Sequence, residues 1–136
     1  MKIFIACSKH FYERIPEIEN KLEELGHNVM MPNSYEEPFR EEMMKELSLE
    51  DHIKFKQEMM RLHETKIKSV DSLLVLNFKK NNQPNYIGGA TFMEIVKAWE
   101  LEKKVYFYNP IPDNIFRDEL IGINPTIIYG DLKKIK

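Results

Sequence analysis

The amino-acid sequence predicts an α/β protein, a three-layer sandwich around a parallel sheet of about five strands. Three observations support this class. Short apolar runs alternate along the chain with segments whose apolar residues recur at helical spacing. The run from Asp71 to Phe78 is apolar without alternation, which is typical of a central strand covered on both faces. A polar loop and a glycine pair, Gly88-Gly89, follow that run and open a helix, as in strand–loop–helix–strand units.

The amino-terminal segment predicts a strand, a helix and a second strand. Lys2 to Cys7 is a short apolar run of the kind found in buried parallel strands. The helix that follows has Pro16 in its first turn, where a missing N–H costs nothing, and ends at Gly26. His27 to Met31 is the second short strand. The apolar stripe of the helix consists of Ile15, Ile18, Leu22 and Leu25.

Two helices are expected before the central strand. Phe39 to Leu47 is a short charged segment, and Ser48 caps a longer helix that runs to about Lys68. The apolar positions of the long helix follow a helical period if a histidine is counted as facing inward: Leu49, Ile53, Met60, His63 and Ile67.

The carboxyl-terminal half continues the alternation. Val105 to Tyr108 is the fourth strand, Ile111 to Gly122 is ambiguous with one short helix as an option, and Thr126 to Tyr129 is a fifth, edge strand. Right-handed crossovers then give the flavodoxin-like order 2-1-3-4-5, in which strands one and three are neighbours. Before the fourth strand, a helix from about Thr91 to Lys103 is expected to bury Phe92, Ile95, Val96 and Trp99.

Length and composition narrow the classes of function. The 136 residues are expected to form a single domain, 1–136, and a net charge of −2 argues against a nucleic-acid partner. The single cysteine, Cys7, cannot form an internal disulfide, so we expect a cytoplasmic protein. We expect no signal peptide, because the apolar run from Ile3 to Cys7 is too short, and no apolar stretch reaches membrane-spanning length, so no membrane partner is expected. Four histidines lack metal-ligand spacing, and we predict neither a metal nor a cofactor.

The predicted ligand site lies where the carboxyl ends of strands one and three meet. In the expected strand order, Ser8 to His10 and Asn77 to Glu94 face one crevice. Gly88 and Gly89 let the backbone approach a ligand closely, and the free N–H groups of a helix start favour phosphate or carboxylate. Glu94 has two interpretations: a functional carboxylate, or the N3 residue of a capping box that begins at Thr91.

Several segments together carry a resemblance to a known family. These segments are Ile3 to Ser8, Leu25-Gly26-His27, Val70 to Asn77, Tyr86 to Gly89, Thr91 to Glu94, Ala98 and Lys103 to Val105. With them the sequence resembles nucleoside 2-deoxyribosyltransferases and the related deoxynucleoside 5′-monophosphate N-glycosidases over roughly residues 2–110. The turn from Gly88 to Glu94 is also similar in outline to a turn of LOG-type phosphoribohydrolases.

This resemblance implies an enzyme that breaks an N-glycosyl bond of deoxynucleosides or their 5′-monophosphates, as a hydrolase or a transferase. Glu94 would be the nucleophile that attacks the anomeric carbon. Gly88, Gly89 and Thr91 would line the sugar or phosphate site, and the first turn, Ala6 to Lys9 with Ser8 and Lys9 as the binding residues, would form the opposite wall. The resemblance also implies a homodimer or a larger homo-oligomer.

Further residues are candidates for contact with the leaving base. A proton or hydrogen bond for the base would come from His63, Glu64, His10 or Asp71. Two of these have structural alternatives, since His63 fits a satisfied core histidine and Asp71 fits an acceptor for nearby backbone N–H groups. Asn77 falls in the crevice. Tyr86, like Tyr35 and Phe39, is a candidate to stack on the base, and such loop aromatics are as often packed at a subunit contact.

The sequence departs from the family at positions that carry acids in the transferases. The aspartate six residues before the nucleophile is replaced by Gly88, and a second aspartate is replaced by His63. These departures suit the alternative function, a non-catalytic nucleotide-binding or sensor module on the same fold.

Overall fold

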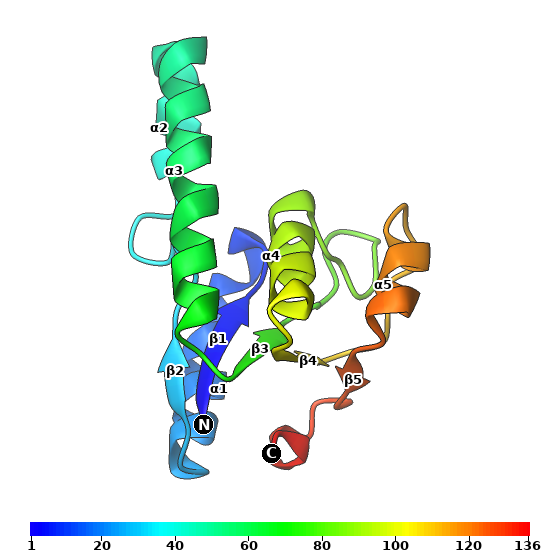
Figure 1. Ribbon diagram of the computed structural model, residues 1–136. Helices are drawn as coiled ribbons and strands as arrows, with labels where there is room; N and C mark the ends of the chain where they lie inside the picture. Colours follow the sequence, from blue (N-terminus) through cyan, green and yellow to red (C-terminus); the bar gives the residue numbers. More distant parts are fainter.

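The computed structural model describes the backbone of residues 1–136 and every side chain except that of Glu41. Five parallel strands form one sheet in the order β2-β1-β3-β4-β5, which confirms the predicted topology (Figure 1). β1 and β3 are neighbours in register, with Ala6 opposite Val75. The strands are β1 (Lys2–Ala6), β2 (Asn28–Met30), β3 (Ser72–Val75), β4 (Lys104–Phe107) and β5 (Thr126–Ile127).

Helices cover both faces of the sheet, as expected for a three-layer sandwich. Alternate residues of β1 enter opposite cores: Ile3 and Ile5 pack with η1 and α1, while Phe4 and Ala6 pack with α3, α4 and α5. The helices are η1 (Lys9–Arg14), α1 (Ile15–Glu24), α2 (Arg40–Leu47), α3 (Leu49–Lys68), α4 (Gly89–Glu100), α5 (Arg117–Ile123) and η2 (Leu132–Lys134).

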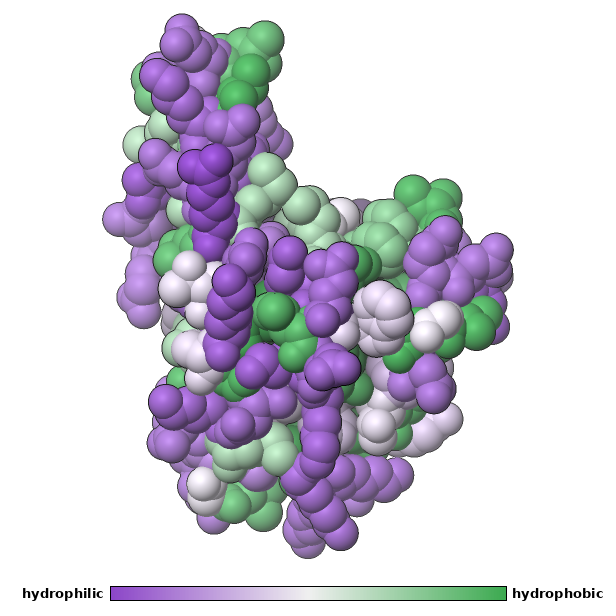
Figure 2. Space-filling view, viewed as in Figure 1, coloured by the Kyte–Doolittle hydropathy of each residue, from purple (hydrophilic) through white to green (hydrophobic). Residues whose placement is uncertain are grey.

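A hairpin of α2 and the amino-terminal half of α3 extends beyond the sheet as an arm (Figure 1). The Ser48 hydroxyl caps α3 by accepting from the Asp51 N–H at 3.0 Å, as the sequence predicted. Leu49 and Ile53 were expected to face inward, but they are 74% and 47% exposed because this half of α3 has only α2 beside it. Figure 2 shows apolar side chains gathered near the tip of the arm.

The buried face of α4 differs from the predicted one by about one residue. It consists of Thr91, Glu94, Ile95 and Ala98, whereas Trp99 is 55% exposed. Phe92 is partly buried and stacks on Phe116, with ring centroids 4.4 Å apart. The buried face of α4 therefore combines one large apolar side chain, Ile95, with small and polar ones, and it includes the carboxyl of Glu94.

At the end of α1, the structure agrees with the expectation for Gly26 but not with the one for Leu25. Gly26 ends α1 with a φ of +92°, a conformation that favours glycine, while Leu25 is 43% exposed instead of buried. No helix in the described part of the chain is both long and apolar enough to cross a membrane.

Candidate functional site

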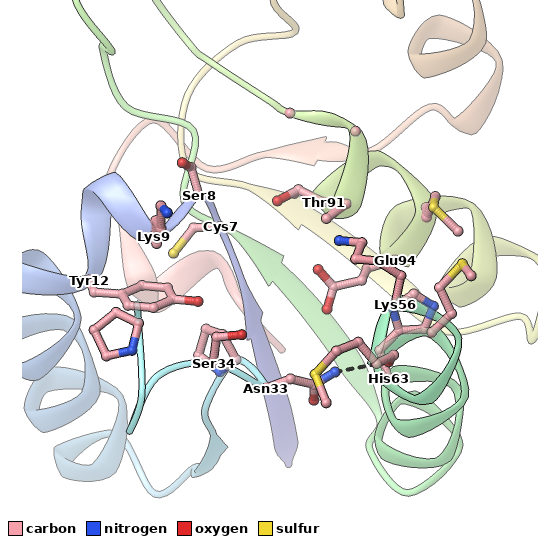
Figure 3. Close-up of a pocket in the computed structure, with 18 of the residues that line it drawn as sticks. Cys7, Ser8, Lys9, Tyr12, Asn33, Ser34, Lys56, His63, Thr91 and Glu94 are labelled. Carbon is pink, nitrogen blue, oxygen red and sulfur yellow. Dashed lines mark hydrogen bonds between the residues drawn. The ribbon is translucent and has the colours of Figure 1, made fainter. Parts of the chain in front are cut away.

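A cavity of about 420 Å³ opens at the carboxyl ends of β1 and β3. Four segments form its walls: the β1–η1 turn, the loop after β2, one face of α3 and the amino-terminal turns of α4 (Figure 3). This is the crevice that the strand order predicted, since parallel sheets bind ligands beyond the carboxyl ends of their strands. Its volume is in the range of small-molecule sites.

Glu94 points from α4 into this cavity (Figure 3). The N-cap of α4 is Gly88, which makes no side-chain capping bond, and Thr91 lies inside the helix. The capping-box interpretation of Glu94 was therefore wrong, because the helix begins three residues earlier than that interpretation requires. Glu94 is in the second turn with a side chain that is only 8% exposed.

The surroundings of Glu94 favour its neutral form. Burial raises the pKa of the carboxyl to about 8, and the Lys66 ammonium acts in the opposite direction. Lys66 is half-buried on α3, and its Nζ donates to the Met31 carbonyl at 3.4 Å. A carboxyl of this kind titrates close to neutral pH, which is the range in which enzymes use acids and bases.

His63 reaches the same cavity from α3. It is 8% exposed, and its pKa is lowered by burial and by the nearby Lys97, against a smaller opposing effect of Glu64. The imidazole is therefore neutral at neutral pH and can donate one N–H and accept at its other nitrogen. Lys56 also lines the cavity from α3. His10 and Glu64 do not line it.

The β1–η1 turn supplies the opposite wall, as predicted. Ser8 caps η1, with its Oγ accepting from the His10 N–H at 3.4 Å, and Lys9 forms an ion pair with Glu42 of α2. Burial, and secondarily Glu94, raises the pKa of the Cys7 thiol to about 12. Cys7 is therefore a protonated, buried side chain, which argues against a thiolate nucleophile.

The glycine turn lines the cavity but not through unusual backbone angles. Gly88 has a φ of −89°, which any residue can adopt, so backbone conformation does not require glycine here. Close packing favours it instead, because a Cβ at this position would lie 3.1 Å from the Tyr86 hydroxyl. A Cβ at Gly89 would meet nothing within 4 Å. Thr91, 4% exposed, completes this wall.

Besides His10 and Glu64, three residues that the sequence placed at the site lie elsewhere. Asp71 precedes β3 and therefore lies at the amino-terminal ends of the strands, opposite the cavity. There its Oδ2 accepts from the Lys2 N–H at 2.7 Å. Asn77 is fully buried and ties β3 to the segment after β4 through three bonds of 2.8 to 2.9 Å with the backbone of residues 109 and 110. Tyr86 packs beside Phe11 and under the Lys80 ammonium.

Other cavity residues were not identified from the sequence. Asn33 and Ser34 come from the loop after β2, and the Asn33 Nδ2 donates to the Met59 carbonyl of α3 at 3.2 Å (Figure 3). Tyr12, Phe55 and Lys56 also line the space. Met59 and Met60 are present as well, and methionine side chains can form an adaptable wall for a flat ligand. Asn33 could have been predicted as a cavity residue, because it is a polar residue that closely follows the carboxyl end of a strand.

Among the described residues, no group of three or more His, Cys, Asp and Glu side chains is arranged to hold a metal ion. The cavity offers a buried carboxyl, a neutral imidazole, hydroxyls and the amino end of a helix. Such a set suits an uncharged or anionic polar ligand with an apolar part.

Comparison with known proteins extends the sequence resemblance to the fold. No protein-family model matches the sequence, and no curated protein matches it. A solved structure of a 2-deoxyribosyltransferase from the psychrotolerant bacterium Bacillus psychrosaccharolyticus is similar, with a TM-score of 0.51 and 20% sequence identity. The alignment covers 79% of this chain and 71% of that chain. At this identity the likeness establishes a shared fold, the fold that the sequence resemblance implied.

Proposed function

We propose that this protein is an N-glycosyl-bond enzyme acting on deoxynucleosides or deoxynucleoside 5′-monophosphates, with Glu94 as the nucleophile. The observation that carries the proposal is the position of Glu94, a buried carboxyl that points into a cavity of about 420 Å³. The family that the sequence resembles has its nucleophile at the corresponding position. The fold shared with a 2-deoxyribosyltransferase also supports an enzyme of this class.

The reaction follows from the chemistry of an acetal-like carbon. An ionised Glu94 oxygen forms a bond to the anomeric carbon while the carbon–nitrogen bond breaks and its electron pair stays with the base. Positive charge develops on the sugar, and an adjacent carboxylate stabilises it. Water then attacks the same carbon, releases the sugar and restores the carboxylate. In the transfer reaction, a second base replaces water.

The other cavity residues have supporting roles in this proposal. His63 donates its N–H to the departing base, and Ser8, Lys9, Gly88, Gly89 and Thr91 surround the sugar and any phosphate. Because burial raises the pKa of Glu94 to about 8, only about a tenth of the carboxyl is ionised at neutral pH in the ligand-free protein. Activity should therefore rise with pH up to about 8.

The raised pKa also favours a second candidate, the nucleotide-binding or sensor module. A protonated Glu94 donates a hydrogen bond to a bound ligand instead of attacking it. The replacement of two family acids by Gly88 and His63 agrees with this alternative.

Turnover separates the two candidates. The wild-type protein is incubated with each deoxynucleoside and each 5′-monophosphate, and free base is measured by chromatography. The enzyme proposal predicts base release that Glu94→Gln abolishes and Glu100→Gln leaves unchanged, because Glu100 is an exposed carboxylate on the same helix. Binding without release by the wild type would support the sensor, and release that survives in Glu94→Gln would refute the role of Glu94.

We further propose a cytoplasmic homo-oligomer that assembles through the arm. The support for assembly is a group of apolar side chains exposed on the arm: Phe39, Met43, Leu47, Leu49 and Ile53, with exposures from 47% to 74%. The support for the location is the lone buried Cys7, which suits a reducing compartment.

A further inference from the structure

A second cavity, of about 470 Å³, lies at the amino ends of β4 and β5. Lys104 and Thr126, the first residues of these two strands, line it. This cavity is therefore at the amino-terminal ends of the strands, whereas the Glu94 cavity is at their carboxyl-terminal ends. No Asp or Glu lines it among the described residues. Its basic and aromatic side chains define what we call the lysine–tryptophan cavity: Trp99, Lys103, Lys104, Lys134 and Lys136.

The four lysines concentrate positive charge in a chain whose net charge is −2. The Lys104 Nζ donates to the Lys136 carbonyl at 2.7 Å, and the Lys103 Nζ to the Lys68 carbonyl at 3.4 Å. An ammonium group has three N–H donors, so each of these lysines keeps donors for a ligand. Among the described side chains, no Asp or Glu forms an ion pair with any of the four lysines.

Trp99 adds a flat apolar surface to this basic cavity. Its side chain is 55% exposed, although tryptophan usually buries most of its surface. An exposed indole next to a hollow provides a face on which a planar ring can stack. Trp99 is the single tryptophan of the chain, so all tryptophan fluorescence comes from a residue that lines this cavity.

We propose that the lysine–tryptophan cavity is a binding site for a nucleoside polyphosphate. The ammonium groups contact the phosphate oxygens, and the base stacks on Trp99. A ligand with charge alone would leave the indole uncovered, and a neutral nucleoside would leave the lysines unpaired. This proposal is independent of the function proposed for the Glu94 cavity, because the two cavities share no lining residue.

Tryptophan fluorescence tests this proposal directly on the full-length protein. ATP is titrated into the wild type with excitation at a wavelength that adenine does not absorb, and pyrophosphate and adenosine are titrated separately. We expect saturable quenching by ATP that weakens as salt is added, since salt screens exposed charges. Pyrophosphate and adenosine should each bind more weakly than ATP.

Variants locate the binding to this cavity. Calorimetric titration of ATP should show a roughly fivefold or greater loss of affinity for the Lys103→Gln, Lys134→Gln double variant, at the modest strength of exposed charge contacts. Lys133→Gln is the matched control, because Lys133 neighbours Lys134 but does not line the cavity. Glu94→Gln should bind ATP at this cavity with unchanged affinity.

Several results would overturn the proposal. These are an absence of quenching at millimolar ATP, equal affinity for ATP and pyrophosphate, and ATP affinity that the double lysine variant does not change. Loss of quenching in Glu94→Gln would also overturn it, because that result would place the nucleotide in the other cavity.

Discussion

Replacing Glu94 with glutamine should change how the stability of the protein depends on pH. The folded protein holds a proton on Glu94 up to about pH 8, whereas the unfolded chain loses it near its ordinary value of 4.5. Burial of the neutral carboxyl therefore adds stability that is fully present below pH 4.5 and is lost as the pH rises towards 8. Integrated between pH 5 and pH 8.5, this difference amounts to about 4 kcal/mol of unfolding free energy.

Urea denaturation of the wild type and of Glu94→Gln at several pH values measures this difference. Glutamine has a similar volume and does not titrate, so subtracting the two curves removes the contribution of the other titrating groups. We expect the variant to gain about 4 kcal/mol relative to the wild type between pH 5 and pH 8.5. Glu100→Gln, an exposed control, should show no such trend. A stability difference that stays constant across this range would refute the argument that Glu94 is buried and neutral.

Three further predictions concern other parts of the molecule. Asn77→Ala should destabilise the protein by about 3 kcal/mol in urea denaturation, because it removes three buried backbone bonds, while exposed Gln83→Ala should change stability little. Gly89→Ala should increase the free energy of unfolding by about 0.5 kcal/mol and so raise the melting temperature slightly, because the added Cβ meets nothing within 4 Å and φ is not positive at this helical position. A large loss of stability would contradict the open space at this position. Leu49→Glu should lower the molar mass measured by light scattering if the arm joins subunits, and an unchanged mass would remove the arm from the assembly.

The sequence predicted the architecture well because hydrophobic pattern and chirality rules act on whole elements. The strand from Asp71 to Phe78 is apolar throughout, and the structure covers β3 on both faces. Adjacent strand pairing then followed from right-handed crossovers. The errors are in helix phase. The largest side chains of the α4 segment suggested a face containing Trp99, but the helix packs with Thr91 and Ala98, which are small enough for close contact with the sheet.

The candidate site was predicted in part, for a reason that concerns strand direction. Glu94, His63, Ser8, Lys9 and the glycine turn meet in one cavity because they follow or flank the carboxyl ends of β1 and β3. Asp71 opens its strand, so in a parallel sheet it must lie at the amino edge, and the sequence already contained that information. Asn77 could not be placed from the sequence, because its bonds are made with residues 109 and 110, which are distant along the chain.

Of the cavity wall contributed by α3, only His63 was named as a catalytic candidate from the sequence. Lys56 and Phe55 line the cavity because of where α3 packs against α4, a contact between segments that are distant along the chain. Helical periodicity gives the face of a helix but not its tilt.

Mass spectrometry of the protein quenched during turnover tests the nucleophilic role of Glu94 most directly. With a deoxynucleoside 5′-monophosphate as substrate, we predict that the peptide containing Glu94 gains the mass of one deoxyribosyl phosphate and that Glu94→Gln gains none. Release of free base by Glu94→Gln at the wild-type rate, with no modified peptide in either protein, would contradict the account.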